Sequence, residues 1–271
     1  MKSAITICLV SEARGGPFVF HEGLADGCAR AAALGFDAVE IFPPSADAIP
    51  IDELKELLKK HRLKVAAFGT GAGWLRLQLS LTSADQSTRQ KAVQFIRQVI
   101  DLAAEFKAPA IIGSMQGRID SAVDREVAIQ WLADGLRELS THAKTKKQPL
   151  LYEPLNRYET NVFHRIGETA DWLRAQKLRN VKILADLFHM NIEEADLPKA
   201  IREAGSAIGH IHFADSNRRA MGMGHTRIKP IIASLEEINY RGYLSAEIFP
   251  YPDSDHAAAQ TIKSFKRATS A

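Results

Sequence analysis

The chain has 271 residues, of which 46% are apolar and 25% are charged, with a formal net charge of +3 at pH 7. This balance is typical of a globular protein with a sizeable core and excludes a disordered chain. The basic residues are scattered among acidic ones, and the densest basic run, Lys144 to Lys147, is interpreted as a solvated helix end. We therefore expect no nucleic-acid partner.

The two cysteines, Cys8 and Cys28, lie within apolar strand-like and helix-like runs, so we expect buried thiols and no disulfide. Met1 to Val10 lacks the length and cleavage pattern of a signal peptide, and no apolar run is long enough to span a bilayer. These features predict a cytoplasmic protein without a membrane partner.

Short apolar runs rich in β-branched residues recur along the chain and predict eight strands. They are Ala4 to Val10, Ala38 to Phe42, Lys64 to Phe68, Ala110 to Gly113, Pro149 to Tyr152, Lys182 to Ala185, Gly209 to Phe213 and Tyr243 to Ile248. Helical periodicity follows each strand. The predicted helices are Gly23 to Leu34, Ile51 to His61, Asp85 to Phe106, Asp124 to Ala143, Ile166 to Gln176, Leu197 to Ala204, Pro230 to Asn239 and Ser254 to Arg267.

Strands that alternate with helices run parallel, and eight such units close a (β/α)8 TIM barrel. The competing fold is a doubly wound open sheet, but Ser11 to Pro17 replaces its Gly-x-Gly-x-x-Gly turn after the first strand. No linker divides the chain, so we predict one α/β domain over residues 1–271. The glycine-rich stretch Gly69 to Trp74 is interpreted as a flexible loop that lines the site.

Ionisable residues occur at the carboxyl ends of the last four predicted strands, where a parallel barrel carries its functional groups. Glu153 ends the fifth, Asp186 ends the sixth, His212 lies in the seventh and Glu247 lies in the eighth. Three carboxylates and one imidazole at similar depths in an apolar barrel need a common cation, because isolated buried charges are costly. Oxygen and imidazole donors suit Mn²⁺, Mg²⁺ or Co²⁺. We interpret His210 as a structural histidine that faces away from His212.

Four segments carry a resemblance that extends over essentially the whole chain. They are Tyr152 to Thr160, Ala185 to Asn191, His210 to Arg218, and Ala246-Glu247. The chain resembles the xylose-isomerase-like sugar isomerases and epimerases, and within them the D-tagatose and D-psicose (allulose) 3-epimerase group.

The resemblance implies a function and a set of site residues. It implies that one divalent ion, with Mn²⁺ as the first expectation, is held by Glu153, Asp186, His212 and Glu247. Glu153 and Glu247 would be the catalytic acid and base, and the substrate-binding residues would be His189, Arg218 and Glu159. The reaction would be epimerisation or isomerisation of a small keto-sugar by proton transfer at C3, or at C2, through a metal-bound cis-enediolate. Relatives suggest a homodimer or homotetramer.

Two other functions stay open at this point. One is a hydroxypyruvate-isomerase-like isomerase of a hydroxy-keto acid, or an inosose-type dehydratase, for which Arg218 or Arg118 would bind a carboxylate. The other is a sugar-binding barrel without catalysis, which the two glutamates argue against. The segments Ser11 to Phe20, Gly69 to Leu75 and Ser114 to Arg118 are expected to form the pocket and to match no named ketose.

Overall fold

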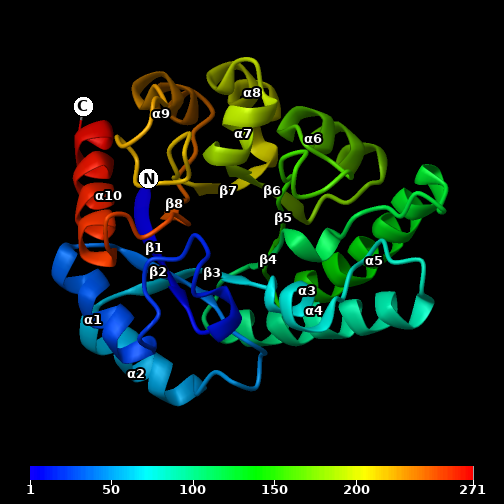
Figure 1. Ribbon diagram of the computed structural model, residues 1–271, viewed down its shortest axis with the longest axis horizontal. Helices are drawn as coiled ribbons and strands as arrows, with labels where there is room; N and C mark the ends of the chain where they lie inside the picture. Colours follow the sequence, from blue (N-terminus) through cyan, green and yellow to red (C-terminus); the bar gives the residue numbers. More distant parts are fainter. Residues whose placement is uncertain (271) are drawn as a thin grey trace.

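The computed structural model describes residues 1–270, in which eight parallel strands form a closed barrel in the order β1 to β8. The strands are β1 (Lys2–Cys8), β2 (Ala38–Phe42), β3 (Lys64–Gly69), β4 (Ala110–Ile112), β5 (Leu150–Tyr152), β6 (Val181–Asp186), β7 (Ile208–His212) and β8 (Tyr243–Ala246). β1 pairs with β8, from Lys2 opposite Tyr243 to Ile5 opposite Ala246, and this pairing closes the ring. The predicted TIM barrel is confirmed (Figure 1).

The helices surround the barrel (Figure 1). They are α1 (Leu24–Leu34), α2 (Ile51–His61), α3 (Ala72–Leu77), α4 (Gln86–Glu105), α5 (Arg125–Thr145), α6 (Ile166–Ala175), α7 (Leu187–Glu193), α8 (Leu197–Ala204), α9 (Ile228–Glu237) and α10 (Ser254–Thr269). Short 3-10 turns occur at Ser11–Ala13, Ser114–Gln116 and Gly205–Ala207. No helix within residues 1–270 is both long and apolar enough to cross a membrane.

All eight predicted helices are present, but the sequence analysis missed α3 and α7. The interpretation of Gly69 to Trp74 as a flexible loop is therefore wrong in part, because α3 begins at Ala72. A Cβ atom on Gly73 would lie 2.6 Å from the sulfur of Met115. This glycine permits close packing of α3, so its presence does not indicate a mobile chain.

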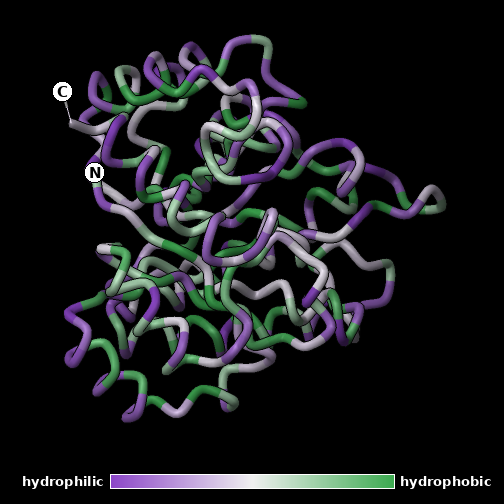
Figure 2. Tube along the Cα trace, turned by 60° about the vertical axis from the view of Figure 1, so that its left-hand side comes forward, coloured by the Kyte–Doolittle hydropathy of each residue, from purple (hydrophilic) through white to green (hydrophobic). Residues whose placement is uncertain are grey.

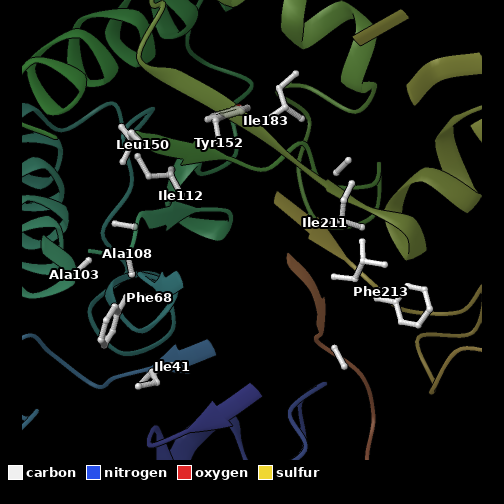
Figure 3. Close-up of a cluster of buried hydrophobic side chains, with 14 of the residues drawn as sticks. Ile41, Phe68, Ala103, Ala108, Ile112, Leu150, Tyr152, Ile183, Ile211 and Phe213 are labelled. Atoms are coloured by element: carbon white, nitrogen blue, oxygen red, sulfur yellow. The ribbon is translucent and has the colours of Figure 1, made fainter. Parts of the chain in front are cut away.

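The barrel has an inner and an outer core because successive strand residues face opposite sides. Inside the ring, Ala67, Ile111, Leu151 and Leu184 form a separate buried cluster. Outside it, apolar side chains of β2 through β7 pack toward the helices, and Figure 3 shows several of them around the ring. Along the outer helices hydrophobic and hydrophilic residues alternate, as this one-sided burial requires (Figure 2).

The predicted state of the two cysteines is confirmed, since both Cys8 and Cys28 are free and buried. Burial raises the pKa of each thiol to about 11. The thiolate is the reactive form, so a raised pKa leaves little of it near neutral pH.

We predict that neither thiol of the native protein reacts with a colorimetric disulfide reagent at about pH 8. Both should react in guanidinium chloride, and the native rate should rise as the pH approaches 11. Rapid reaction of the native protein at neutral pH would contradict this assignment.

Candidate active site

Four side chains from consecutive strand ends meet at the carboxyl end of the barrel, where three carboxylates surround one imidazole nitrogen. The Nδ1 atom of His212 lies 3.3 Å from Glu153 Oε1, 3.4 Å from Asp186 Oδ2 and 3.8 Å from Glu247 Oε2. Donor atoms of Glu153, Asp186 and His212 all lie within 4.8 Å of one another. The structure therefore brings together the four residues that the sequence analysis selected as ligands.

Side chains alternate between the two faces of a strand, and this alternation places the site residues inside the barrel. Leu151 and Leu184 belong to the inner cluster, so Glu153 and Asp186, two residues further along, face the same interior. Asp186 is also the N-cap of α7: its Oδ1 accepts a 2.7 Å hydrogen bond from the Phe188 amide, which leaves Oδ2 free to face the site.

Gly113 makes room for Glu153. A Cβ atom at position 113 would overlap Glu153 Oε2, so this glycine reflects close approach of a side chain to the backbone.

Four polar atoms that face the centre of this cluster have no hydrogen-bond partner among residues 1–270. They are Glu153 Oε1, Asp186 Oδ2, His189 Nε2 and His212 Nδ1, and all are buried. Buried polar atoms are normally satisfied. Bonds of about 2.1 Å to one ion place neighbouring ligand atoms roughly 3.0 to 3.5 Å apart, close to the separations from His212 Nδ1 to the Glu153 and Asp186 oxygens. The donor set fits a hard or borderline divalent cation.

The charges of this cluster perturb the titration of its members. Burial raises the pKa of Glu247 to about 8, against the opposing effect of His212 and Arg218. Burial also acts to raise the pKa of Asp186, but the histidines His189 and His212 outweigh it and hold that pKa at about 2. Burial acts to lower the pKa of His212, yet nearby carboxylates raise it well above its usual value. Such strongly perturbed groups in one pocket are typical of functional sites.

A fifth charged residue, Glu40 of β2, was missed by the sequence analysis. It is fully buried, and its two oxygens lie 2.6 Å from His210 Nε2 and 2.9 Å from His212 Nε2. Burial acts to raise the pKa of Glu40, but the two histidines hold it far below the usual range. The signal was present in the sequence, since Glu40 interrupts the apolar strand Ala38 to Phe42.

The predicted orientation of His210 is wrong. Residues two apart in a strand share a face, so His210 and His212 point into the same interior, with ring centroids 5.7 Å apart. Both bind the carboxylate of Glu40, which places His210 in the polar network of the site.

His189, on α7, turns one ring nitrogen toward the cluster. Its Nδ1 lies 2.8 Å from Asn156 Nδ2 and accepts from the Asn156 amide at 3.3 Å. Because both neighbours are donors, the ring proton belongs on Nε2, which lies 3.7 Å from Asp186 and 3.9 Å from Glu153. His189 thus presents a donor to the space above the carboxylates.

Arg218 lies between two carboxylates. It donates to Glu247 Oε1 at 2.7 Å and to Glu159 Oε1 at 3.2 Å, and its guanidinium lies over the ring of Phe188. Burial acts to lower the pKa of Arg218, but Glu247 and the other carboxylates raise it, so the group stays charged. All three predicted substrate-binding residues therefore lie beside the cluster of Glu153, Asp186, His212 and Glu247.

A pocket of about 390 Å³ opens above this cluster and includes Glu153, Glu159, Arg218 and Glu247 in its wall. Much of the rest of the wall comes from three segments, which contribute Glu12, Ala13, Gly15 to Phe18, Gly69 to Ala72, Trp74, Leu75 and Ser114. These are parts of the segments expected to form the pocket. Strand residues and their neighbours complete the wall, namely Cys8, Val10, Phe42, Ile111, Gly113 and Leu155. Arg118 is absent from this wall, and its guanidinium donates to the Tyr158 carbonyl.

The fold and this site identify the class of protein. Residues 28–268 match the family described as "Xylose isomerase-like TIM barrel", and the chain belongs to that family.

Named relatives show which members of this family the chain is similar to. The chain is 30% identical to D-psicose 3-epimerase of Agrobacterium fabrum over 224 residues, which cover 81% of this chain and 77% of the relative. It is 27% identical to L-ribulose 3-epimerase of a Methylomonas species, with 89% and 83% covered. A crystal structure of D-psicose 3-epimerase with D-tagatose from Clostridium cellulolyticum is similar with a TM-score of 0.81, 25% identity and 98% of both chains covered. The chain is thus an enzyme of the isomerase class.

We predict that Gly113→Ala weakens Mn²⁺ binding by roughly tenfold or more, because the new methyl group displaces Glu153 from the cluster. Calorimetric titration of the metal-free protein measures this change.

Gly167→Ala is the matched control, since a Cβ atom there meets nothing within 4 Å. It should leave metal binding unchanged and stabilise α6 slightly. Equal Mn²⁺ affinities for Gly113→Ala and the wild type would contradict the prediction.

Proposed function

We propose that the protein is a divalent-metal-dependent epimerase of a small keto-sugar that moves a proton at C3. The observation that supports this most directly is the convergence of three carboxylate side chains on Nδ1 of His212 beneath a sugar-sized pocket. The relatives named as 3-epimerases of D-psicose and L-ribulose support the choice of reaction.

The residues that would hold the ion are Glu153, Asp186, His212 and Glu247, with Mn²⁺ as the proposed metal. The bound ion would supply a Lewis acid for the ketone oxygen, which lowers the cost of removing a proton from the adjacent carbon. Glu153 and Glu247 would remove and return the proton. They follow β5 and β8, so they approach the site from different parts of the ring.

The neighbouring side chains would orient the sugar. His189 would donate from Nε2 to a substrate oxygen, and Arg218 would donate to another while Glu159 and Glu247 hold its guanidinium in place. Glu159 also accepts from Asn156 Nδ2 at 3.1 Å, so its carboxylate has a fixed position for a sugar hydroxyl.

The charge of the wall argues against a keto acid substrate. Among the described residues that line the pocket, Arg218 is the single cationic side chain, and two carboxylates already bind it. Apart from the proposed ion, a substrate carboxylate that loses its water there would find no free cationic side chain in the described wall.

We predict that Glu153→Gln and Glu247→Gln each lower turnover of D-psicose by about 10²- to 10⁴-fold, because each removes one proton-transfer group. Chromatography of the C3 epimer that forms measures this turnover. Glu105→Gln, on the exposed surface beside Lys55, serves as the control and should convert D-psicose at the wild-type rate. Formation of the epimer at the wild-type rate by either site variant would refute its assigned role.

We also predict that dialysis against a chelator abolishes turnover and lowers the melting temperature. Restoring Mn²⁺ to about 100 times its dissociation constant should recover about 2.7 kcal/mol of stability. Calorimetry and turnover measured on the same samples check both effects. A chelated protein with unchanged melting temperature and activity would exclude the metal site.

A substrate panel tests the class of sugar. We expect turnover of neutral ketoses such as D-psicose, D-tagatose or L-ribulose and none of short hydroxy-keto acids, for the electrostatic reason given above. Product analysis by chromatography decides the matter, and activity confined to the acids would overturn the epimerase proposal.

A further inference from the structure

Glu40 joins two histidines inside the barrel, on the side of His212 that faces away from the proposed metal position. Its carboxylate is fully buried, and each oxygen contacts one imidazole, at 2.6 Å for His210 and 2.9 Å for His212. β2 and β7 are not neighbours in the ring, so this contact crosses the barrel interior. Ile41, the residue that follows Glu40, belongs to the outer core and is labelled in Figure 3.

The chemistry of the contact defines where the ring protons lie. An ionised carboxylate only accepts hydrogen bonds, so Nε2 of both histidines carries a proton. In neutral His212 the other nitrogen, Nδ1, then keeps its lone pair. That atom is the one surrounded by Glu153 and Asp186 at 3.3 and 3.4 Å.

The two groups of possible ligands that share His212 differ in how well their atoms are satisfied. In the group of Glu40, His210 and His212, every contacting nitrogen and oxygen has a partner within 2.9 Å. In the group of Glu153, Asp186 and His212, the facing atoms lack partners among residues 1–270. The first group therefore has the geometry of a hydrogen-bonded support, and the second has that of a cation site.

We propose that Glu40 is a positioning residue that fixes the tautomer and ring orientation of His212, and that His210 anchors Glu40 in turn. The inference rests on the proposed metal site. Without Glu40 the Nε2 atom of His212 would lose the one acceptor that it has among residues 1–270, and the proton could then move to Nδ1, where it would block the ion.

The test compares two variants of the same buried cluster. Glu40→Leu removes the acceptor for His212, whereas His210→Gln keeps a donor to Glu40 and leaves the bond from Glu40 to His212 in place. Titration of each metal-free protein with Mn²⁺, followed by the electron paramagnetic resonance signal of free Mn²⁺, gives the dissociation constants. We expect Glu40→Leu to bind roughly 10- to 100-fold more weakly than the wild type and His210→Gln to stay within about threefold.

Glu40→Gln adds a rescue experiment, because its amide oxygen can still accept from His212. We expect its Mn²⁺ affinity to lie between those of Glu40→Leu and the wild type. Wild-type affinity in Glu40→Leu, or an equal loss in His210→Gln, would overturn the positioning role. A wild type that binds no Mn²⁺ would overturn the proposed function and this inference with it, so the two failures are distinguishable.

A measurement on the wild type avoids any failure of a variant to fold. Nitrogen-15 NMR of histidine-labelled protein saturated with Mg²⁺ should show a proton on Nε2 of His212, in slow exchange with solvent. A His212 ring with a bare Nε2 and a protonated Nδ1 would contradict the proposal.

Discussion

Three carboxylates that point at one buried imidazole are the constraint on which the site depends. Glu153, Asp186 and Glu247 lie beside His212 at the buried floor of the pocket, where unpaired negative charges are expensive. The structure balances part of this charge with Arg218, which binds Glu247 directly. A divalent cation would balance the rest, and the same ion would make the pocket reactive.

The barrel supplies this arrangement through strand geometry. The ends of β5 to β8 meet at one rim, and the period of two along each strand turns the chosen residues inward. Local features then refine each position: α7 takes one oxygen of Asp186 as its cap, and Gly113 leaves space for Glu153. Across the interior, Glu40 holds the far side of His212.

The pocket has two chemically different ends. Near the cluster the wall is charged, with Arg218 held between Glu159 and Glu247. Farther out it is largely apolar, with Phe18, Phe42, Trp74 and Leu75 contributed by the β1, β2 and β3 strand ends and the segments that follow. In the proposed enzyme, different segments would therefore carry the reaction chemistry and the choice of substrate, as is common in barrels whose loops vary around a fixed rim.

The sequence alone determined the barrel and the set of late strand ends that bear charge, because strand and helix periodicity and lone carboxylates in apolar runs are local signals. It could not show α3, whose Gly73 fits against Met115 only once the barrel is closed. Nor did it pair Glu40 with His210 and His212, residues about 170 positions apart that meet across the interior. Which charged groups share an ion, a proton or a hydrogen bond depends on long-range distances, and these exist only in the folded chain.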